Sequence, residues 1–260
     1  MCYPIRKTAS NAARKLMAPQ PSAQPRPSRK PFSQTINKTA VCRKTAGKGR
    51  AARRNRLLVA VGDVHGELEG FLQLLCHAGL TDSHGGWRGG SATMVQIGDI
   101  VDRGPNPFEV QNLLAKLQKE APRSGGAVVL LLGNHELEIL KGNYAITTLS
   151  QNQITQFVKT LHEDVRSGRV VAAFCRQDYL FTHAGLTADL QDLFAAQGLR
   201  TAKELAGAIN DVFMRAAETG DYSHPIFYVG STRGGPHRFG GIFWEDIEDL
   251  FYSANPLSIK

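Results

Sequence analysis

Apolar positions in the middle of the chain follow two periods, one typical of buried strands and the other typical of amphipathic helices. Short apolar runs at 57–62, 93–97 and 127–132 are expected to form strands. Between these runs, apolar residues at i, i+3, i+4 and i+7 predict helices near 66–79 and 106–120. Because strands and helices alternate, this segment is expected to be an α/β fold built around a parallel sheet.

The following segment predicts a different series of elements. An amphipathic helix is expected over 151–167, and two β-rich runs at 169–175 and 179–182 are expected to pair as a hairpin. Capping residues at Thr187 and Thr201 predict two more helices further along the chain. These elements are expected to complete the same domain.

Residues 1–56 differ in composition from the rest of the chain. They hold 15 of the 31 Lys and Arg residues and no Asp or Glu, whereas the remainder holds 16 basic and 23 acidic residues. Because this Pro-, Ser- and Arg-rich tail has few large apolar residues, it is expected to be disordered. Three roles stay open for it: a solvated extension, which includes translated sequence upstream of a later start; organelle targeting; and a tether to RNA or another anionic surface.

The acidic remainder argues against a globular nucleic-acid binder, so nucleic-acid binding is expected only weakly, through the tail. No apolar run approaches the ~18 residues that cross a bilayer, so we expect a soluble, cytoplasmic protein with no membrane partner, and organelle targeting by the tail stays open. The four cysteines lie far apart without a CxxC pair. They are expected to be free thiols in a reducing compartment, with a disulfide between two distant cysteines as the alternative.

Each of the first three expected strands ends in a glycine that precedes a residue able to bind metal. Asp63 and His65 follow the first strand, and in extended backbone they point the same way and can reach one point in space. Asp99 follows the second strand and Asn134 the third. Because the carboxyl ends of parallel strands meet at one edge of a sheet, these side chains are expected to form one site. Oxygen and nitrogen ligands together favour Mn, Fe or Zn.

Four motifs occur in order along the chain: GDVHG at 62–66, GDIVDRG at 98–104, GNHE at 133–136 and HAG at 183–185. This series resembles the phosphoprotein phosphatase branch of the calcineurin-like metallophosphoesterases. The first part of the domain is most similar to the Shewanella-like protein phosphatases of bacteria and plastids. The resemblance implies that 57–260 is a metallophosphoesterase domain, with a four-layer α/β/β/α sandwich and mixed sheets.

The resemblance also implies two divalent or trivalent metal ions, which can clamp a phosphate between them. Asp99 would bridge the two ions, Asp63 and His65 would complete the first site, and Asn134 and His183 would serve the second. Taken alone, Asn134 would be interpreted as a turn cap and His183 as a core histidine. The ordered set of motifs favours the metal-binding interpretation for both.

Residues beside the metal ligands take their expected roles from the same resemblance. Arg103 is the candidate for bidentate binding of phosphate oxygens, a geometry that Lys cannot provide. His135 is expected to donate a proton to the leaving group and not to bind metal. Asp102 is expected to orient His135 and keep it charged. Glu136 is expected to support this network without being catalytic.

The last part of the sequence departs from the family pattern. An arginine for a second phosphate contact is expected here, and Arg233 is the candidate, with Arg238 as its competitor. The family also supplies a last histidine to the second metal, whereas this sequence ends at Lys260, and His224 and His237 lie too early. We therefore expect a truncated sequence that lacks the last strands of the fold and binds the second metal weakly.

The resemblance implies a phosphatase that hydrolyses phosphate monoesters in one step, by direct attack of a metal-bound hydroxide. The expected substrate is a phosphorylated protein, modified on Ser/Thr or on Tyr. A dinucleoside polyphosphate or small phosphoester hydrolase is the alternative within the same fold. A degenerate, non-catalytic scaffold with an anion-binding basic tail is the alternative from another class.

Overall fold

The computed structural model describes residues 57–247 of the 260. The expected disorder of the basic tail and the expected loss of the last strands concern 1–56 and 248–260, so both predictions lie outside the described residues. Within the described part, no helix combines the length and the apolar composition needed to cross a membrane.

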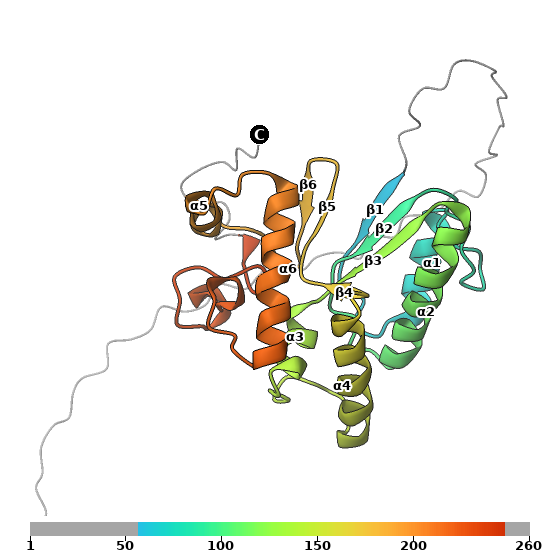
Figure 1. Ribbon diagram of the computed structural model, residues 1–260. Helices are drawn as coiled ribbons and strands as arrows, with labels where there is room; N and C mark the ends of the chain where they lie inside the picture. The colour runs from blue at the N-terminus through green and yellow to red at the C-terminus, as the bar shows by residue number, and fades with distance from the viewer. Residues whose placement is uncertain (1–56, 248–260) are drawn as a thin grey trace, which may run out of the picture. The chain divides into compact units, whose positions relative to one another are not determined.

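A parallel sheet of four strands forms the centre of the domain (Figure 1). Its strands lie side by side in chain order, and all neighbours run in the same direction. Every residue of the second strand is buried, as expected for a strand with neighbours on both sides. The strands are β1 (Leu58–Val61), β2 (Thr93–Gln96), β3 (Ala127–Leu131) and β4 (Val170–Val171).

Two amphipathic helices cover one face of this sheet, α1 (Leu68–His77) and α2 (Pro107–Glu120) (Figure 1). Each buries the apolar stripe that its sequence predicted, with Phe71 and Leu75 on α1 and four residues from Val110 to Leu117 on α2. A short 3-10 helix, η1 (Ala121–Ser124), leads from α2 to β3. The predicted alternation of strands and helices is therefore confirmed.

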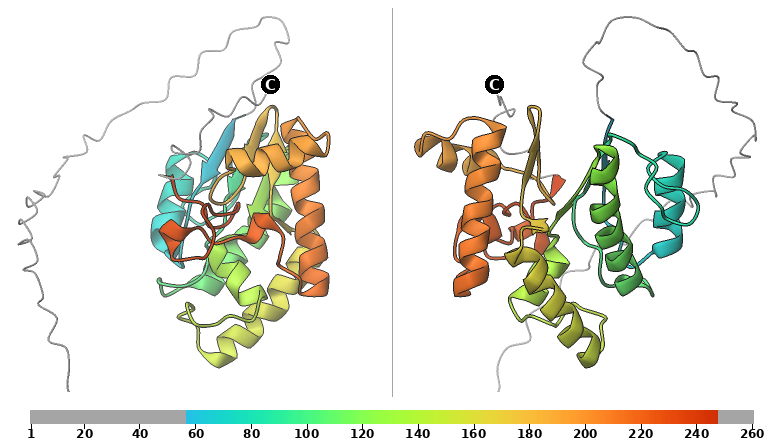
Figure 2. Two further views of the ribbon diagram at one scale, coloured as in Figure 1. Left: turned by 90° about the vertical axis from the view of Figure 1, so that its left-hand side faces the viewer. Right: turned by 45° about the vertical axis from the view of Figure 1, so that its right-hand side comes forward.

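The other face of the sheet is turned toward an antiparallel hairpin (Figure 2). The hairpin consists of β5 (Phe174–Arg176) and β6 (Tyr179–Phe181), and α6 (Ala202–Thr219) packs on its outer side. Helix α5 (Ala188–Ala196) lies beside α6. The order helix, sheet, hairpin, helix gives the expected four layers. Parallel and antiparallel pairs are both present, but among the described residues each direction has its own sheet.

The predicted hairpin of the runs 169–175 and 179–182 is confirmed by the antiparallel pairing of β5 with β6, but the first run is divided between two sheets. The chain belongs to β4 up to Val171 and to β5 from Phe174. Between them, the backbone N–H groups of Ala172 and Ala173 both donate to Oδ1 of Asn210, at 2.9 Å each. A side chain of α6 thus replaces a strand partner at this point and lets the chain pass from one sheet to the other.

The remaining helices connect these layers. Helix α3 (Asn134–Leu140) begins directly after β3, and α4 (Gln151–Arg166) buries Phe157 and Leu161 and matches the helix predicted over 151–167. The segment after α6 contains two short 3-10 helices, η2 (Pro225–Phe227) and η3 (Ser231–Arg233).

Candidate active site

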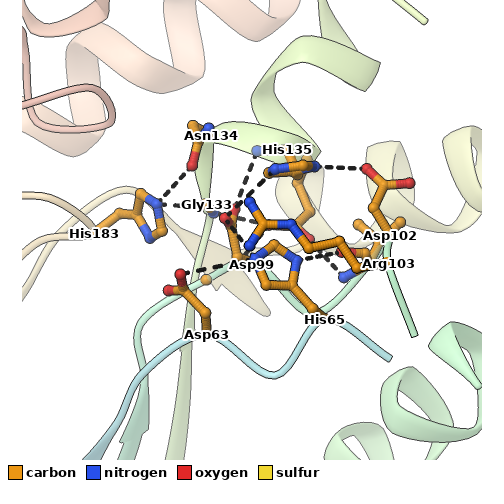
Figure 3. A network of polar contacts seen from close by, with 12 residues as sticks. Asp63, His65, Asp99, Asp102, Arg103, Gly133, Asn134, His135 and His183 are labelled. Carbon is orange, nitrogen blue, oxygen red and sulfur yellow. Dashed lines mark hydrogen bonds and ion pairs between the residues drawn. The ribbon is translucent and has the colours of Figure 1, made fainter. Parts of the chain in front are cut away.

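Polar residues that follow different strands gather at one edge of the parallel sheet (Figure 3). Asp63, Asp99 and Asn134 each stand two or three residues beyond the ends of β1, β2 and β3, and His183 stands two residues beyond β6. The parallel order of the strands explains this convergence, because it places their carboxyl ends side by side. The loops that the sequence singled out therefore meet in space.

Asp99 lies at the centre of this group, and its side chain is 3% exposed. Its Oδ2 lies 3.6 Å from Nε2 of His65 and 4.0 Å from Nε2 of His135, whereas its Oδ1 lies 3.8 Å from Nε2 of His183. These separations exceed hydrogen-bond length. They fit ligand atoms that share a cation at about 2.0–2.2 Å from each.

The three imidazoles are each fixed by a hydrogen bond at the opposite nitrogen. Nδ1 of His65 lies 2.9 Å from the carbonyl oxygen of Val101, and Nδ1 of His183 lies 2.7 Å from that of Ile97. Nδ1 of His135 is bonded to a carboxylate. Because a neutral ring whose Nδ1 donates has its lone pair at Nε2, the carbonyl contacts of His65 and His183 orient Nε2 for metal binding, as in many protein metal sites. The carboxylate beside His135 instead allows both ring nitrogens to hold protons.

Asn134 completes the polar group beside His183. In one orientation of its amide, Oδ1 faces the Asp99 carboxylate and lies 2.8 Å from Nε2 of His183. In the other, Nδ2 donates to both Asp99 oxygens and to His183. The first orientation brings oxygen and nitrogen acceptors together, which is the arrangement that a cation stabilises and that hydrogen bonds alone do not.

The donor set therefore fits a metal centre. Nε2 of His65 is buried and has no hydrogen-bond partner within the described residues, a lack that a cation would remedy. Asp99 belongs to two possible ligand groups, the position expected of a bridging carboxylate. One group consists of His65, Asp99 and His135, and the other of Asp63, Asp99 and His183. The expectation had placed Asp63 with His65, and had not counted His135 as a ligand.

The loops that carry these residues have an unusual backbone. Among the described residues, five non-glycine residues have positive φ, and four of them are His65, Asp99, Asp102 and Arg103, with φ between 47° and 70°. Left-handed backbone is uncommon for residues other than glycine, although Asp and His adopt it more often than most, and a cluster of four such residues indicates that the surroundings impose it. Gly133 allows the close approach of the neighbouring loop, because a Cβ there would meet Oδ1 of Asp99 at 2.1 Å.

Glu136 imposes this conformation on the loop after β2. Its Oε2 accepts the N–H groups of Asp99 and Gly133, at 2.9 Å each, and its Oε1 accepts those of Ile100 and Val101, at 2.9 and 3.2 Å. Burial, together with the charge of Asp99, raises the pKa of Glu136 to about 7. The sequence predicted a supporting role for this residue, but not that one side chain would satisfy four backbone donors.

Asp102 and His135 form the expected pair, with Oδ2 and Nδ1 2.7 Å apart. The hydrogen bond to Asp102 raises the pKa of His135 against the opposing effect of burial, and the charge of Asp99 adds to the increase. Burial alone would raise the pKa of Asp102, but hydrogen bonds from His135, Thr147 and Thr148 together outweigh it and lower that pKa. The pair therefore favours a charged imidazole beside an ionised carboxylate.

The two arginines differ in their surroundings. Arg103 is exposed, and in Figure 3 its side chain is directed from its turn toward the group around Asp99. Nε of Arg233 lies 3.0 Å from Oδ2 of Asp246, and its side chain is 52% exposed. This ion pair leaves the role of Arg233 in phosphate binding a prediction.

Thr147 and Thr148 are site residues that sequence reasoning missed. Both bond to the carboxylate of Asp102 from the loop between α3 and α4. They belong to none of the four motifs and lie 45 and 46 residues from their partner. No local signal distinguishes such threonines from others in a polar loop, so only the tertiary structure identifies them.

Comparisons with known proteins agree with this geometry. A family model described as calcineurin-like phosphoesterase matches residues 57–250. The chain is 43% identical over 91 residues to Shewanella-like protein phosphatase 2 of Arabidopsis thaliana and 40% identical over 82 residues to Shewanella-like protein phosphatase 1 of Plasmodium berghei. These matches cover 35% and 32% of this chain, and each spans 23% of the relative's length.

Among solved structures, the fold is similar to that of a cold-active protein-tyrosine phosphatase from a psychrophilic Shewanella species. The TM-score is 0.54 at 24% identity, over 78% of this chain and 61% of that one. At this identity the likeness concerns the fold alone. Because the family model matches well over half of the residues, the resemblance of the motifs is confirmed, and the chain belongs to the calcineurin-like phosphoesterase family.

Proposed function

We propose that this domain hydrolyses phosphate monoesters with the help of two bound metal ions, Mn, Fe or Zn. The observation that carries the proposal is the buried carboxylate of Asp99, which belongs to both possible ligand groups. Asp63, His65, Asn134 and His183 would provide the remaining ligands. When bound, such a pair of cations neutralises charge on a phosphate and activates water for attack.

The residues around the metal ligands supply the rest of the chemistry. Arg103 would bind phosphate oxygens through two parallel N–H groups, which orients the phosphate and offsets its charge. His135, held at Nδ1 by Asp102, has Nε2 directed toward the centre of the group. A charged imidazole in this position would give its proton to the departing alkoxide or phenoxide oxygen.

Phosphorylated protein is the substrate class that we propose. Support comes from the similarity to two relatives named protein phosphatases, and each match spans 23% of the relative's length. Phosphoserine, phosphothreonine and phosphotyrosine all remain substrates to test, because the reacting group is the same phosphate monoester.

The test measures release of inorganic phosphate from phosphoserine and phosphotyrosine peptides. For the competing substrate, diadenosine tetraphosphate, it measures the nucleotide products, ADP or ATP with AMP, by chromatography. Each is assayed after removal of metal by a chelator and again after addition of Mn, Fe or Zn. We expect peptide hydrolysis that is lost with the metal and returns with it. Preference for the dinucleotide would establish the alternative hydrolase, and no hydrolysis of any substrate with metal would contradict the proposal.

A further inference from the structure

The loop of residues 141–149, between α3 and α4, lies outside the four motifs but contacts the pair of Asp102 and His135, called the acid pair below. Most of its residues are exposed, including Tyr144 and Ile146. Thr147 and Thr148, at its end, contact Asp102, which is 1% exposed in its side chain. A surface loop thus bonds directly to a buried carboxylate of the site.

The two oxygens of Asp102 have separate partners. Oδ1 accepts the hydroxyl of Thr147 at 2.5 Å and the backbone N–H of Thr148 at 2.9 Å, with the hydroxyl of Thr148 further away at 3.4 Å. Oδ2 is bonded to Nδ1 of His135. Because a carboxylate rotates about its Cβ–Cγ bond unless both oxygens are held, the donors on Oδ1 fix the direction in which Oδ2 meets the imidazole.

Thr148 also joins the acid pair to the phosphate-binding candidate. Its hydroxyl accepts the backbone N–H of Arg103 at 3.2 Å while it faces Oδ1 of Asp102. Both of these neighbouring residues have left-handed backbone, with φ of 63° and 70°. The threonine hydroxyl therefore stabilises the turn from which Arg103 and Asp102 project.

We propose that Thr147 and Thr148 are positioning residues for proton donation by His135, an inference that rests on the proposed phosphatase function. Neither threonine touches the reacting atoms. They act through Asp102, whose orientation determines where Nε2 of His135 presents its proton. Efficient proton donation requires the donor to lie within hydrogen-bond reach of the leaving oxygen, so a small rotation of the imidazole lowers the rate.

Thr147 has a second, local contact that a test must separate from the first. Its hydroxyl oxygen accepts the N–H of Leu149 at 3.2 Å, so its loss also removes a bond within the loop. A purely structural effect would slow all substrates alike. A positioning effect would slow most those substrates whose leaving group needs a proton.

The experiment compares a phosphoserine peptide with p-nitrophenyl phosphate in wild type, Thr147→Val and Thr147→Ser. The alkoxide of serine requires protonation, whereas p-nitrophenolate leaves with little help. Because general acid catalysis contributes about 10²–10⁴-fold, we expect Thr147→Val to lower kcat for the peptide at least ~10-fold. For p-nitrophenyl phosphate we expect kcat to fall less than ~3-fold, because its leaving group needs little general acid catalysis. KM should be nearly unchanged for both substrates, and Thr147→Ser should restore kcat for the peptide.

Thr148→Val tests the second hydroxyl in the same way, and we expect a smaller loss because its backbone N–H still donates to Asp102. Thr155→Val is the matched control: it is exposed on α4, and its hydroxyl bonds to the carbonyl of Gln151. The control should leave both substrates unaffected. Thermal melting of every variant shows whether the fold is retained.

An NMR measurement tests the inference without turnover. The Nδ1 proton of His135 should give a low-field signal that moves in Thr147→Val and returns in Thr147→Ser. Equal losses on both substrates, or an unmoved signal, would overturn the positioning role while leaving the phosphatase function intact. A wild type that hydrolyses neither substrate with metal would refute the proposed function, and the NMR signal would then decide the inference alone.

Discussion

The two halves of the described domain contribute to the site in different ways. In 57–140, consecutive parallel strands end beside one another, and each delivers a ligand candidate within a few residues of its end. In 141–247, one strand end delivers His183, whereas Thr147 and Thr148 come from a loop. The first half places its residues by sheet topology, and the second by individual long-range contacts.

This difference shows that ligands and supporting residues follow separate rules. A residue that follows a parallel strand lies at the site because hydrogen bonds between neighbouring strands place their carboxyl ends side by side. A residue such as Thr148 lies at the site because its hydroxyl finds partners on another loop. Replacing a ligand candidate should therefore lower activity more than replacing a residue that only supports one.

The largest loss is expected for Asp99→Asn, which removes the carboxylate shared by both ligand groups. Metal ions contribute several kcal/mol of transition-state stabilisation, so we expect kcat/KM to fall about 10³-fold or more. Calorimetric metal binding should weaken in parallel. Asp192→Asn, on the exposed surface of α5, is the control. Unchanged activity in Asp99→Asn would favour the non-catalytic scaffold.

A smaller loss is expected for Glu136→Gln, which keeps the shape of the side chain. One oxygen becomes an amide NH₂ that faces two backbone donors, so two of the four backbone hydrogen bonds that Glu136 accepts from the loops after β2 and β3 are lost. We expect metal affinity to fall about 10–100-fold, the usual effect of losing a residue that orients ligands. Equilibrium dialysis measures it.

Glu138→Gln is the matched control for this prediction. Glu138 is also buried on α3, but its carboxylate bonds to Lys141 and Asn143 at the far end of the helix. If both variants lose affinity equally, the effect comes from destabilisation of α3 and not from the loop that Glu136 holds.

The third prediction concerns pH. The hydrogen bond to Asp102 raises the pKa of His135, and proton donation requires the charged imidazole. Activity toward a phosphoserine peptide should therefore decline as the pH rises through that pKa. In Asp102→Asn the pKa falls, so the alkaline limb of the kcat profile should move to lower pH. An alkaline limb at the same pH in both proteins would exclude His135 as the acid.

The smallest expected effect concerns the pH dependence of stability in the second half of the domain. Burial, with the nearby charge of Arg215, lowers the pKa of His224, which stacks on Phe194. The unfolded chain therefore binds a proton more readily, so the stabilisation present above about pH 6.5, the ordinary pKa of histidine, is lost as the pH falls through the lowered pKa.

His224→Asn tests this linkage while keeping an acceptor for the N–H of Ile226. We expect the variant to lose less stability than wild type between pH 8 and pH 5, measured as the difference in melting temperature. Identical pH dependence in both proteins would show that His224 makes no contribution to acid sensitivity. Activity at pH 8 should be unaffected, in contrast to the variants of the first half.

The sequence alone determined the elements of the first half and the residues at their ends. The strands β1, β2 and β3 and the helices between them follow from local periodicity, which needs no knowledge of distant contacts. Asp63, Asp99 and Asn134 were predictable as neighbours because they follow successive parallel strands. The pairing of Asp102 with His135 was expected from the resemblance of the motifs.

Only the tertiary structure decided which residues share partners across long distances. It divided the run 169–175 because Asn210 on α6 takes two backbone N–H groups, and it grouped His135 with His65 around Asp99. It also brought Thr147 to a carboxylate 45 residues away. Such contacts depend on how packed elements and their loops meet. A single hydroxyl or amide produces no periodic pattern in the sequence, so its partner cannot be predicted from the sequence.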